Sequence, residues 1–153
     1  MATASHTYFT YSTPHGPVTI GASARGVVQV AYEATRLDGA NKASALTNQA
    51  ANQLQEYLAG KRHTFDIALD MQGSPFQKEV WAQVCEIPYG ETRTPTQIAE
   101  AIGKAGSHRS VGTAIRMNKL APFVPTHRVS QPNATGQQAR IFRAFQTLEK
   151  RAR

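Results

Sequence analysis

Apolar and polar residues alternate through the first third of the chain, which is the pattern of strands with one buried face. The alternating stretches cover residues 8–12, 18–21 and 27–32. A turn at 14–17 and a second at Arg25-Gly26 separate them, so we expect a three-stranded antiparallel meander. The polar residues 35–43 predict a loop, and residues 65–70 alternate again and predict a short extended segment.

The apolar spacing then changes to that of helices. Residues 46–58 carry apolar side chains on one helical face, and Gly60 predicts the end of that helix. Ser74-Pro75-Phe76-Gln77 and Thr94-Pro95-Thr96-Gln97 each combine a capping box with proline at the first helical position. Two more helices are predicted over about 108–118 and 138–150. The chain is therefore expected to be α+β, with strands first and helices later.

Two of these helices, at 95–103 and 108–118, are joined by a four-residue turn, which is typical of a helix-turn-helix. Small side chains on the second helix would let its backbone approach a groove, and cations around it would meet phosphates. The candidate DNA contacts are Thr94, Pro95, Arg109, Ser110, Gly112, Thr113, Arg116 and Lys119. An ordinary helical hairpin, in which small residues serve close packing, is the alternative.

The charge distribution favours a polyanionic partner. The 153 residues carry a net charge of +7. Residues 1–75 hold five basic and five acidic residues, whereas residues 76–153 hold twelve basic and five acidic ones. The whole excess therefore lies in the second half, as nucleic-acid binding would require. A basic surface kept for solubility is the alternative.

Composition excludes several other classes of protein. A hydrophobic content of 41% suits a globular chain, and no apolar run is long enough for a membrane span. Residues 1–7 lack the features of a signal peptide, so we expect a cytoplasmic protein. The single cysteine, Cys85, excludes an internal disulfide and a cysteine-cluster metal site. We expect no metal and no cofactor, and a monomer.

Several strings occur in an order that resembles the O6-alkylguanine-DNA alkyltransferase family. The strings are Phe76-Gln77-Lys78-Glu79-Val80-Trp81, Ile87-Pro88-Tyr89-Gly90-Glu91-Thr92, Gln97-Ile98-Ala99, Ile102-Gly103, Arg109-Ser110-Val111-Gly112, Asn118 and Pro125-Thr126-His127-Arg128-Val129. The similarity is strong over 73–129 and looser before that. It implies a ribonuclease-H-like N-terminal subdomain over 1–72 and a winged helix-turn-helix subdomain over 73–153. Such proteins bind the minor groove of double-stranded DNA, flip the damaged guanine and move its O6-alkyl group to a cysteine.

The resemblance also implies roles for individual residues. Arg109 matches the arginine that takes the place of the flipped base, and Asn118 matches the asparagine that braces the active-site turn. His127 matches the base that activates the thiol, Glu149 the carboxylate that orients this histidine, and Arg128 a buried structural arginine. A phosphate contact for Arg109 and a helix C-cap for Asn118 are the alternatives.

The sequence departs from the family at three places. Thr126 occupies the position of the acceptor cysteine, and a threonine hydroxyl is a far weaker nucleophile than a thiolate. Pro95 stands where the family has a tyrosine that helps rotate the nucleotide. The segment 130–138, which would wall the base pocket, is about four residues short of the family length. Cys85 lies far from the acceptor position, and we interpret it as a partly exposed thiol without function.

These departures favour a protein similar to the alkyltransferase-like group, which keeps the fold, replaces the cysteine and flags lesions for other repair proteins. Those proteins usually carry Trp or Ala at the acceptor position, so Thr126 is unusual. A repair enzyme is the alternative, either through the methyltransferase lineage or through a hydrolytic activity that uses His127 and Glu149. A third hypothesis is an engineered threonine in an otherwise active enzyme, against which Pro95 and the short loop argue.

Overall fold

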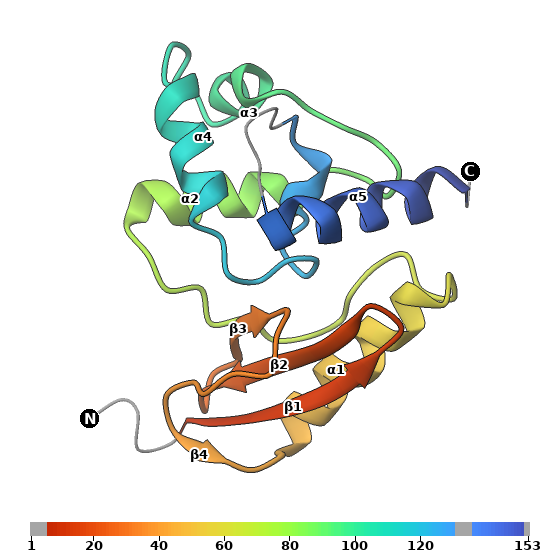
Figure 1. Cartoon of the computed structure of the whole chain (residues 1–153). Coiled ribbons are helices and arrows are strands. Elements are labelled where there is room, and N and C mark those ends of the chain that lie inside the picture. The colour runs from red at the N-terminus through yellow and green to blue at the C-terminus, as the bar shows by residue number, and fades with distance from the viewer. Residues whose placement is uncertain (1–5, 131–135, 152–153) are drawn as a thin grey trace. The chain divides into compact units, whose positions relative to one another are not determined.

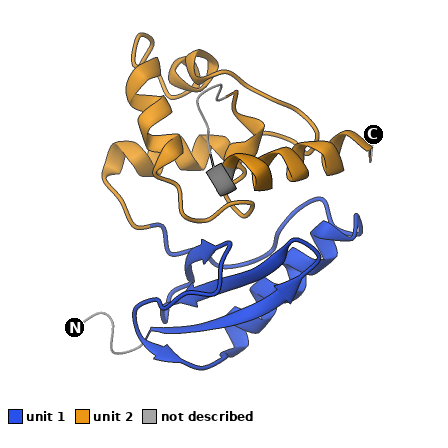
Figure 2. Cartoon of the chain, in the orientation of Figure 1, with its two compact units in different colours: residues 1–71 blue, residues 72–153 orange. Residues whose placement is uncertain are grey.

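The computed structural model describes residues 6–130 and 136–151, without the side chains of 136–138. The chain divides into two compact units, Met1–Met71 and Gln72–Arg153 (Figure 2). The first unit contains a sheet and one long helix, and the second contains the remaining helices (Figure 1). This arrangement confirms the expected α+β class, with strands first and helices later.

The first unit contains a four-stranded sheet in the order β3-β2-β1-β4. Its strands are β1 (Thr7–Thr13), β2 (Gly16–Ala22), β3 (Val27–Ala31) and β4 (Ala40–Asn41). The first three form the expected antiparallel meander, in which Thr7 pairs with Ala22 and Thr19 with Ala31. At the turn between β1 and β2, Gly16 has a φ of 102°, a conformation that favours glycine.

The prediction of three strands and a loop over 35–43 was wrong in one respect, because β4 pairs in parallel with β1. The Ala40 N–H donates to the His6 carbonyl over 3.0 Å. A strand of two exposed residues has no alternating pattern, and its pairing is set by a partner more than thirty positions away in sequence. Periodicity therefore could not indicate it.

Helix α1 (Ala45–Leu58) supplies the other half of this unit's core. Ser44 caps its first turn by accepting from the Thr47 N–H. The side chains of Ala50, Leu54 and Tyr57 are fully buried, and α1 contacts β1, β2 and β3. The extended segment predicted over 65–70 makes one bridge, between Leu69 and Val27.

The second unit is built from α2 (Pro75–Val84), α3 (Pro95–Ala101), α4 (His108–Arg116), the 3-10 turn η2 (Thr126–Arg128) and α5 (Gly136–Arg151). Both predicted capping boxes are present, at Ser74 and Thr94. Helix α4 ends two residues before the predicted end, and α5 begins two residues before the predicted start. The core holds Trp81, whose indole N–H donates to the Ala114 carbonyl over 2.8 Å and ties α2 to α4.

None of the helices in residues 6–130 and 136–151 has the length and apolar character needed to cross a membrane.

Candidate functional site

A buried turn between α4 and α5 contains Thr126, for which the family resemblance predicts the acceptor position. Thr126 opens η2 and is fully buried. The Asn118 side-chain amide donates to the Val124 carbonyl and to the Thr126 hydroxyl oxygen, each over 3.0 Å. The amide oxygen of Asn118 accepts from the Leu120 N–H over 2.9 Å. One side chain thus holds three points of the turn and fixes the orientation of the Thr126 hydroxyl.

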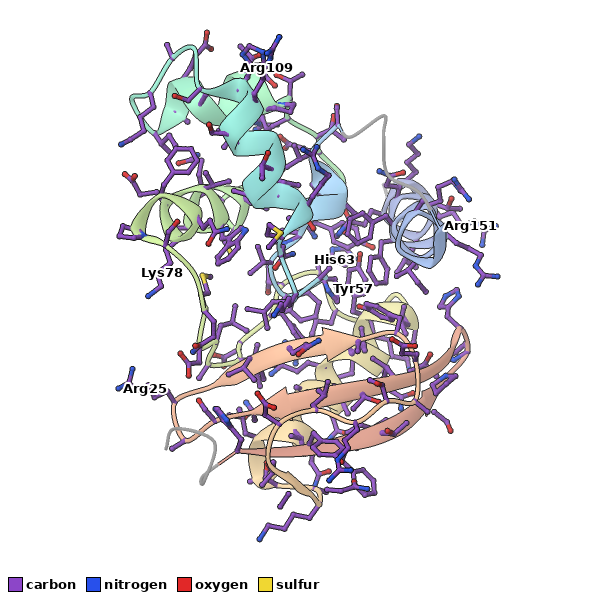
Figure 3. The ribbon with its side chains drawn as sticks, turned by 60° about the vertical axis from the view of Figure 1, so that its left-hand side comes forward. Arg25, Tyr57, His63, Lys78, Arg109 and Arg151 are labelled. Carbon is purple, nitrogen blue, oxygen red and sulfur yellow. The ribbon has the colours of Figure 1, made fainter. Side chains whose placement is uncertain are left out.

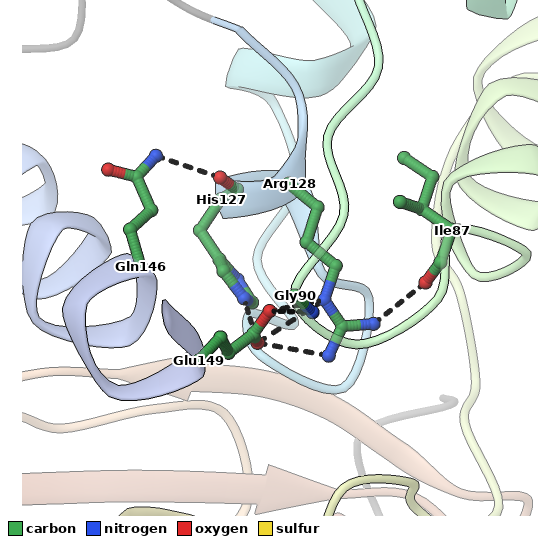
Figure 4. Close-up of polar contacts among 6 residues, drawn as sticks. All are labelled: Ile87, Gly90, His127, Arg128, Gln146 and Glu149. Carbon is green, nitrogen blue, oxygen red and sulfur yellow. Dashed lines mark hydrogen bonds and ion pairs between the residues drawn. The ribbon is translucent and has the colours of Figure 1, made fainter. Parts of the chain in front are cut away.

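Two ionisable side chains of η2, His127 and Arg128, meet a third, Glu149 of α5 (Figure 4). The His127 Nε2 lies 2.5 Å from Glu149 Oε2, and Arg128 donates to both carboxylate oxygens at 3.0–3.2 Å. The Gly90 N–H donates to Oε1 over 2.9 Å. All three ionisable residues are at most 6% exposed. The carboxylate is therefore paired and hydrogen-bonded, as a buried charge must be.

Arg128 also has partners besides the carboxylate. It donates to the Ile87 carbonyl over 2.8 Å, and its guanidinium lies 5.5 Å from the centre of the Tyr89 ring. These contacts link η2 to the segment that follows α2. They suit a guanidinium in a buried pair, because its fixed fork of donors matches several acceptors at once.

The protonation of His127 follows from this environment. Burial of the ring lowers the pKa of His127; the hydrogen bond to Glu149 and its charge oppose this shift, and the charge of Arg128 adds to it. We assign a neutral ring, because Arg128 already balances the carboxylate and a second buried cation would be uncompensated. A neutral ring beside a carboxylate carries its hydrogen on Nε2, so its basic nitrogen is Nδ1.

A cavity of about 170 Å³ opens beside Glu149. Gly90, Thr92, Gln146 and Lys150 line it together with the three ionisable residues. Gln146 also donates to the His127 carbonyl over 2.9 Å, which links α5 to η2 a second time. The cavity is large enough for several water molecules.

The exposed face of α4 carries four of the eight candidate DNA contacts. Arg109, Ser110, Thr113 and Arg116 are exposed and lie along this face, and Lys119 follows just after the helix. Arg116 donates to the Thr113 hydroxyl over 3.3 Å. Arg109 projects from the outer end of α4 (Figure 3). A helix with a cationic, small-residue face is what a groove-binding element requires.

Gly112 is the buried member of the candidate contacts on α4. At 100° per residue, it lies between Arg116 of the exposed face and Ile115 of the core face. Its approach to DNA stays a prediction.

Met117, which directly follows α4, is 53% exposed and was not among the predicted contacts. Helical spacing places it near Thr113 and Ser110 on the exposed face, and this spacing could have indicated it. At the start of α3, Thr94 is exposed and caps the helix, and Pro95 is half-buried.

Cys85 lies at the C-cap of α2, and the residue as a whole is exposed to solvent. Its thiol nevertheless sits 4.0 Å from the Phe123 carbonyl, to which it donates weakly. Burial of the sulfur, with the charge of Glu86, raises the pKa of Cys85 to about 11, although Arg128 opposes the shift. A thiol with this pKa holds its proton at neutral pH and is a poor nucleophile.

Two further predictions concern the surroundings of the site. No group of three His, Cys, Asp or Glu side chains suited to a metal ion occurs in the part of the chain that the structure describes. The shortened pocket loop predicted over 130–138 lies mostly outside the described residues, which resume at 136.

Both units match models of one protein family. The model described as "6-O-methylguanine DNA methyltransferase, ribonuclease-like domain" matches residues 7–71, and the one described as the DNA binding domain of the same methyltransferase matches residues 75–151. Together these two matches cover most of the chain.

Individual proteins of the same description are also similar to this chain in sequence. A methylated-DNA–protein-cysteine methyltransferase of Methanosarcina barkeri is 51% identical over 81 residues, which are 53% of this chain and 51% of that protein. The chain thus spans about half the length of this relative. The protein of the same name from Mycobacterium tuberculosis is 38% identical over 127 residues, which are 80% of this chain and 76% of that one.

A crystal structure of Mycobacterium tuberculosis OGT in complex with DNA superposes with a TM-score of 0.84 at 35% sequence identity and covers 95% of this chain and 94% of that one. The fold, both domain matches and these relatives agree. The chain belongs to the 6-O-methylguanine DNA methyltransferase family.

Proposed function

We propose that this protein binds duplex DNA through α4, recognises O6-alkylated guanine in the minor groove, and does not accept the alkyl group. The observation that carries the proposal is that Thr126, to which the family pattern assigns the acceptor position, lies fully buried with its hydroxyl held by Asn118. The relatives are named for transfer to a protein cysteine. This chain has a threonine in that turn and its one cysteine elsewhere.

The chemistry of a hydroxyl explains why transfer should fail. A histidine removes a proton efficiently only from a group whose pKa is near its own. A thiol has a pKa near 8.5, whereas an aliphatic hydroxyl lies several units higher. At about 1.4 kcal/mol per unit, the change from thiol to hydroxyl costs on the order of 5–10 kcal/mol. The raised pKa of Cys85 argues in the same way against that thiol as a substitute.

The hydrolytic alternative has less support. A general base needs a site for the proton that it removes, but both oxygens of Glu149 already accept from Arg128. Glu149 is therefore better suited to hold His127 and Arg128 in place than to take a proton. His127 alone remains as a base in that scheme, and none of the described residues around it indicates hydrolysis.

DNA binding by α4 is supported by the family's DNA-binding domain and by the cationic exposed face. Arg109 stands at the start of this face, where an arginine can enter a groove and occupy the gap left by a flipped base. In the proposed role, loss of the Arg109 side chain removes both a charge and this insertion.

A gel-shift comparison tests the proposal. The two duplexes would be identical except for one O6-methylguanine, and we expect tighter binding of the modified one. Arg109→Ala should weaken binding and leave the melting curve unchanged, whereas the control Lys78→Ala, which removes an exposed cation from α2, should keep its affinity. Equal affinity for both duplexes would exclude lesion recognition, and an unchanged Arg109→Ala variant would remove this residue from the interface.

A further inference from the structure

Helix α5 carries a second strongly cationic surface. Arg140, Arg143, Lys150 and Arg151 are all exposed on it. At 100° per residue, these four positions and Thr147 fall within an arc of about 100°, so they form one face, which we call the α5 face. It extends for about 17 Å along the helix axis.

The α5 face has no negative charge to balance it among the residues that the structure describes. Glu149, the one acidic residue of α5, is buried on the opposite side and is paired with Arg128. None of the ion pairs within 6–130 and 136–151 involves a cation of the α5 face. Four like charges this close together repel one another, so a surface of this kind is stabilised by an anionic partner.

The α5 face is separate from the exposed face of α4. Arg109 lies at the outer end of α4 and Arg151 lies on α5, on a different side of the unit (Figure 3). The α4 face and its flank provide three cations, Arg109, Arg116 and Lys119. The α5 face provides four. Four of these seven cations therefore lie outside the surface through which α4 is proposed to contact DNA.

We infer that the α5 face is a second binding surface for the phosphate backbone of duplex DNA. The inference rests on the proposed function, because it assigns a further contact to the same partner. Each strand of a duplex carries one phosphate per ~3.4 Å of the duplex axis, so ~17 Å of duplex presents about five phosphates per strand. Four exposed long side chains, three of them arginines, provide flexible cationic contacts for phosphates over such a length.

The salt dependence of binding measures how many phosphates are neutralised, because each one releases counterions. The slope of log K against log salt is about −0.9 per phosphate. Three cations on α4 alone predict a slope of about −2.7, and seven predict about −6.3. Between 50 and 200 mM salt these slopes correspond to losses of about 40-fold and about 6,000-fold in affinity.

The test compares the full chain with two variants on one 30-base-pair duplex. The α5 variant carries Arg140→Gln, Arg143→Gln, Lys150→Gln and Arg151→Gln. The control variant carries Arg25→Gln, Lys42→Gln, Lys61→Gln and Lys78→Gln, which removes the same charge from exposed positions outside both faces. Far-UV circular dichroism and melting curves establish that both variants fold.

We expect a slope near −6 for the original chain and the control, and a slope near −3 for the α5 variant. A slope near −3 for all three proteins would overturn the inference and leave DNA binding by α4 standing. An equal change in both variants would also overturn it, because net charge rather than the α5 face would then be responsible. Absence of binding by the original chain would instead contradict the proposed function.

Discussion

Replacing Glu149 by glutamine should strongly destabilise the second unit. The substitution keeps the shape of the side chain but removes its charge and turns one acceptor oxygen into a donor NH2 group. Four groups now donate to the carboxylate, from His127, Arg128 and Gly90. A single amide oxygen cannot accept from all of them, and the new NH2 group faces other donors.

The size of the effect follows from burial. Arg128 is 6% exposed, so without the carboxylate its charge would remain inside the unit with the Ile87 carbonyl and the Tyr89 ring as partners. Breaking a buried ion pair by removing one partner costs about 3–5 kcal/mol. With a urea dependence of about 2 kcal/mol per molar, the midpoint of unfolding should fall by about 1.5–2.5 M.

Urea unfolding followed by tryptophan fluorescence measures this directly, because Trp81 is the single tryptophan and is buried in the same unit. Glu91→Gln is the matched control. It also removes a carboxylate that pairs with an arginine, Arg93 at 3.1 Å, but both of its side chains are more than a third exposed. An exposed pair contributes about 0–1 kcal/mol, so this variant should unfold close to the original chain.

If Glu149→Gln lost no more stability than Glu91→Gln, the carboxylate would not hold the buried cluster together. The assignment of Arg128 as a structural partner of Glu149 would then fail.

Three further results are expected. Asn118→Ala should lower the free energy of unfolding by about 2–3 kcal/mol in urea, because buried groups of the turn lose their partner. Because the pKa of His127 is lowered in the folded protein, the unfolded chain takes up a proton at a higher pH than the folded chain does. The free energy of unfolding should therefore be fully present above about pH 6.5 and fall as the pH drops below it. Urea unfolding at pH 7.5 and 5.5 should show a smaller loss of stability for His127→Phe than for the original chain. Thr126→Cys should restore little methyl transfer to the protein, measured by intact mass, because Pro95 remains; rapid transfer would show an intact pocket.

Local patterns predicted the elements of this protein well. The two capping boxes at Ser74 and Thr94 were read from four residues each, because their hydrogen bonds lie within one helical turn. The helix-turn-helix followed from the spacing of apolar residues on either side of a short turn. The antiparallel meander followed from alternation, since each strand has its next neighbour in sequence beside it.

Other features depend on contacts between distant residues, which local pattern does not contain. Strand β4 exists because its backbone meets β1. Glu149 meets His127 across 22 positions, and this pairing was implied only by resemblance to a family. Its pairing with Arg128 was not predicted. The burial of Gly112 depends on which side of α4 faces the core, and a small residue fits either side.

In the proposed function, this protein binds alkylated DNA and leaves the alkyl group in place. The direct measurement is the intact mass of the protein after incubation with a duplex that contains O6-methylguanine, at concentrations where gel shift shows the protein to be bound. We expect an unchanged mass and an unchanged methylguanine content of the DNA. A gain of one methyl group, on Thr126 or on Cys85, would contradict the claim and make this chain an alkyl acceptor.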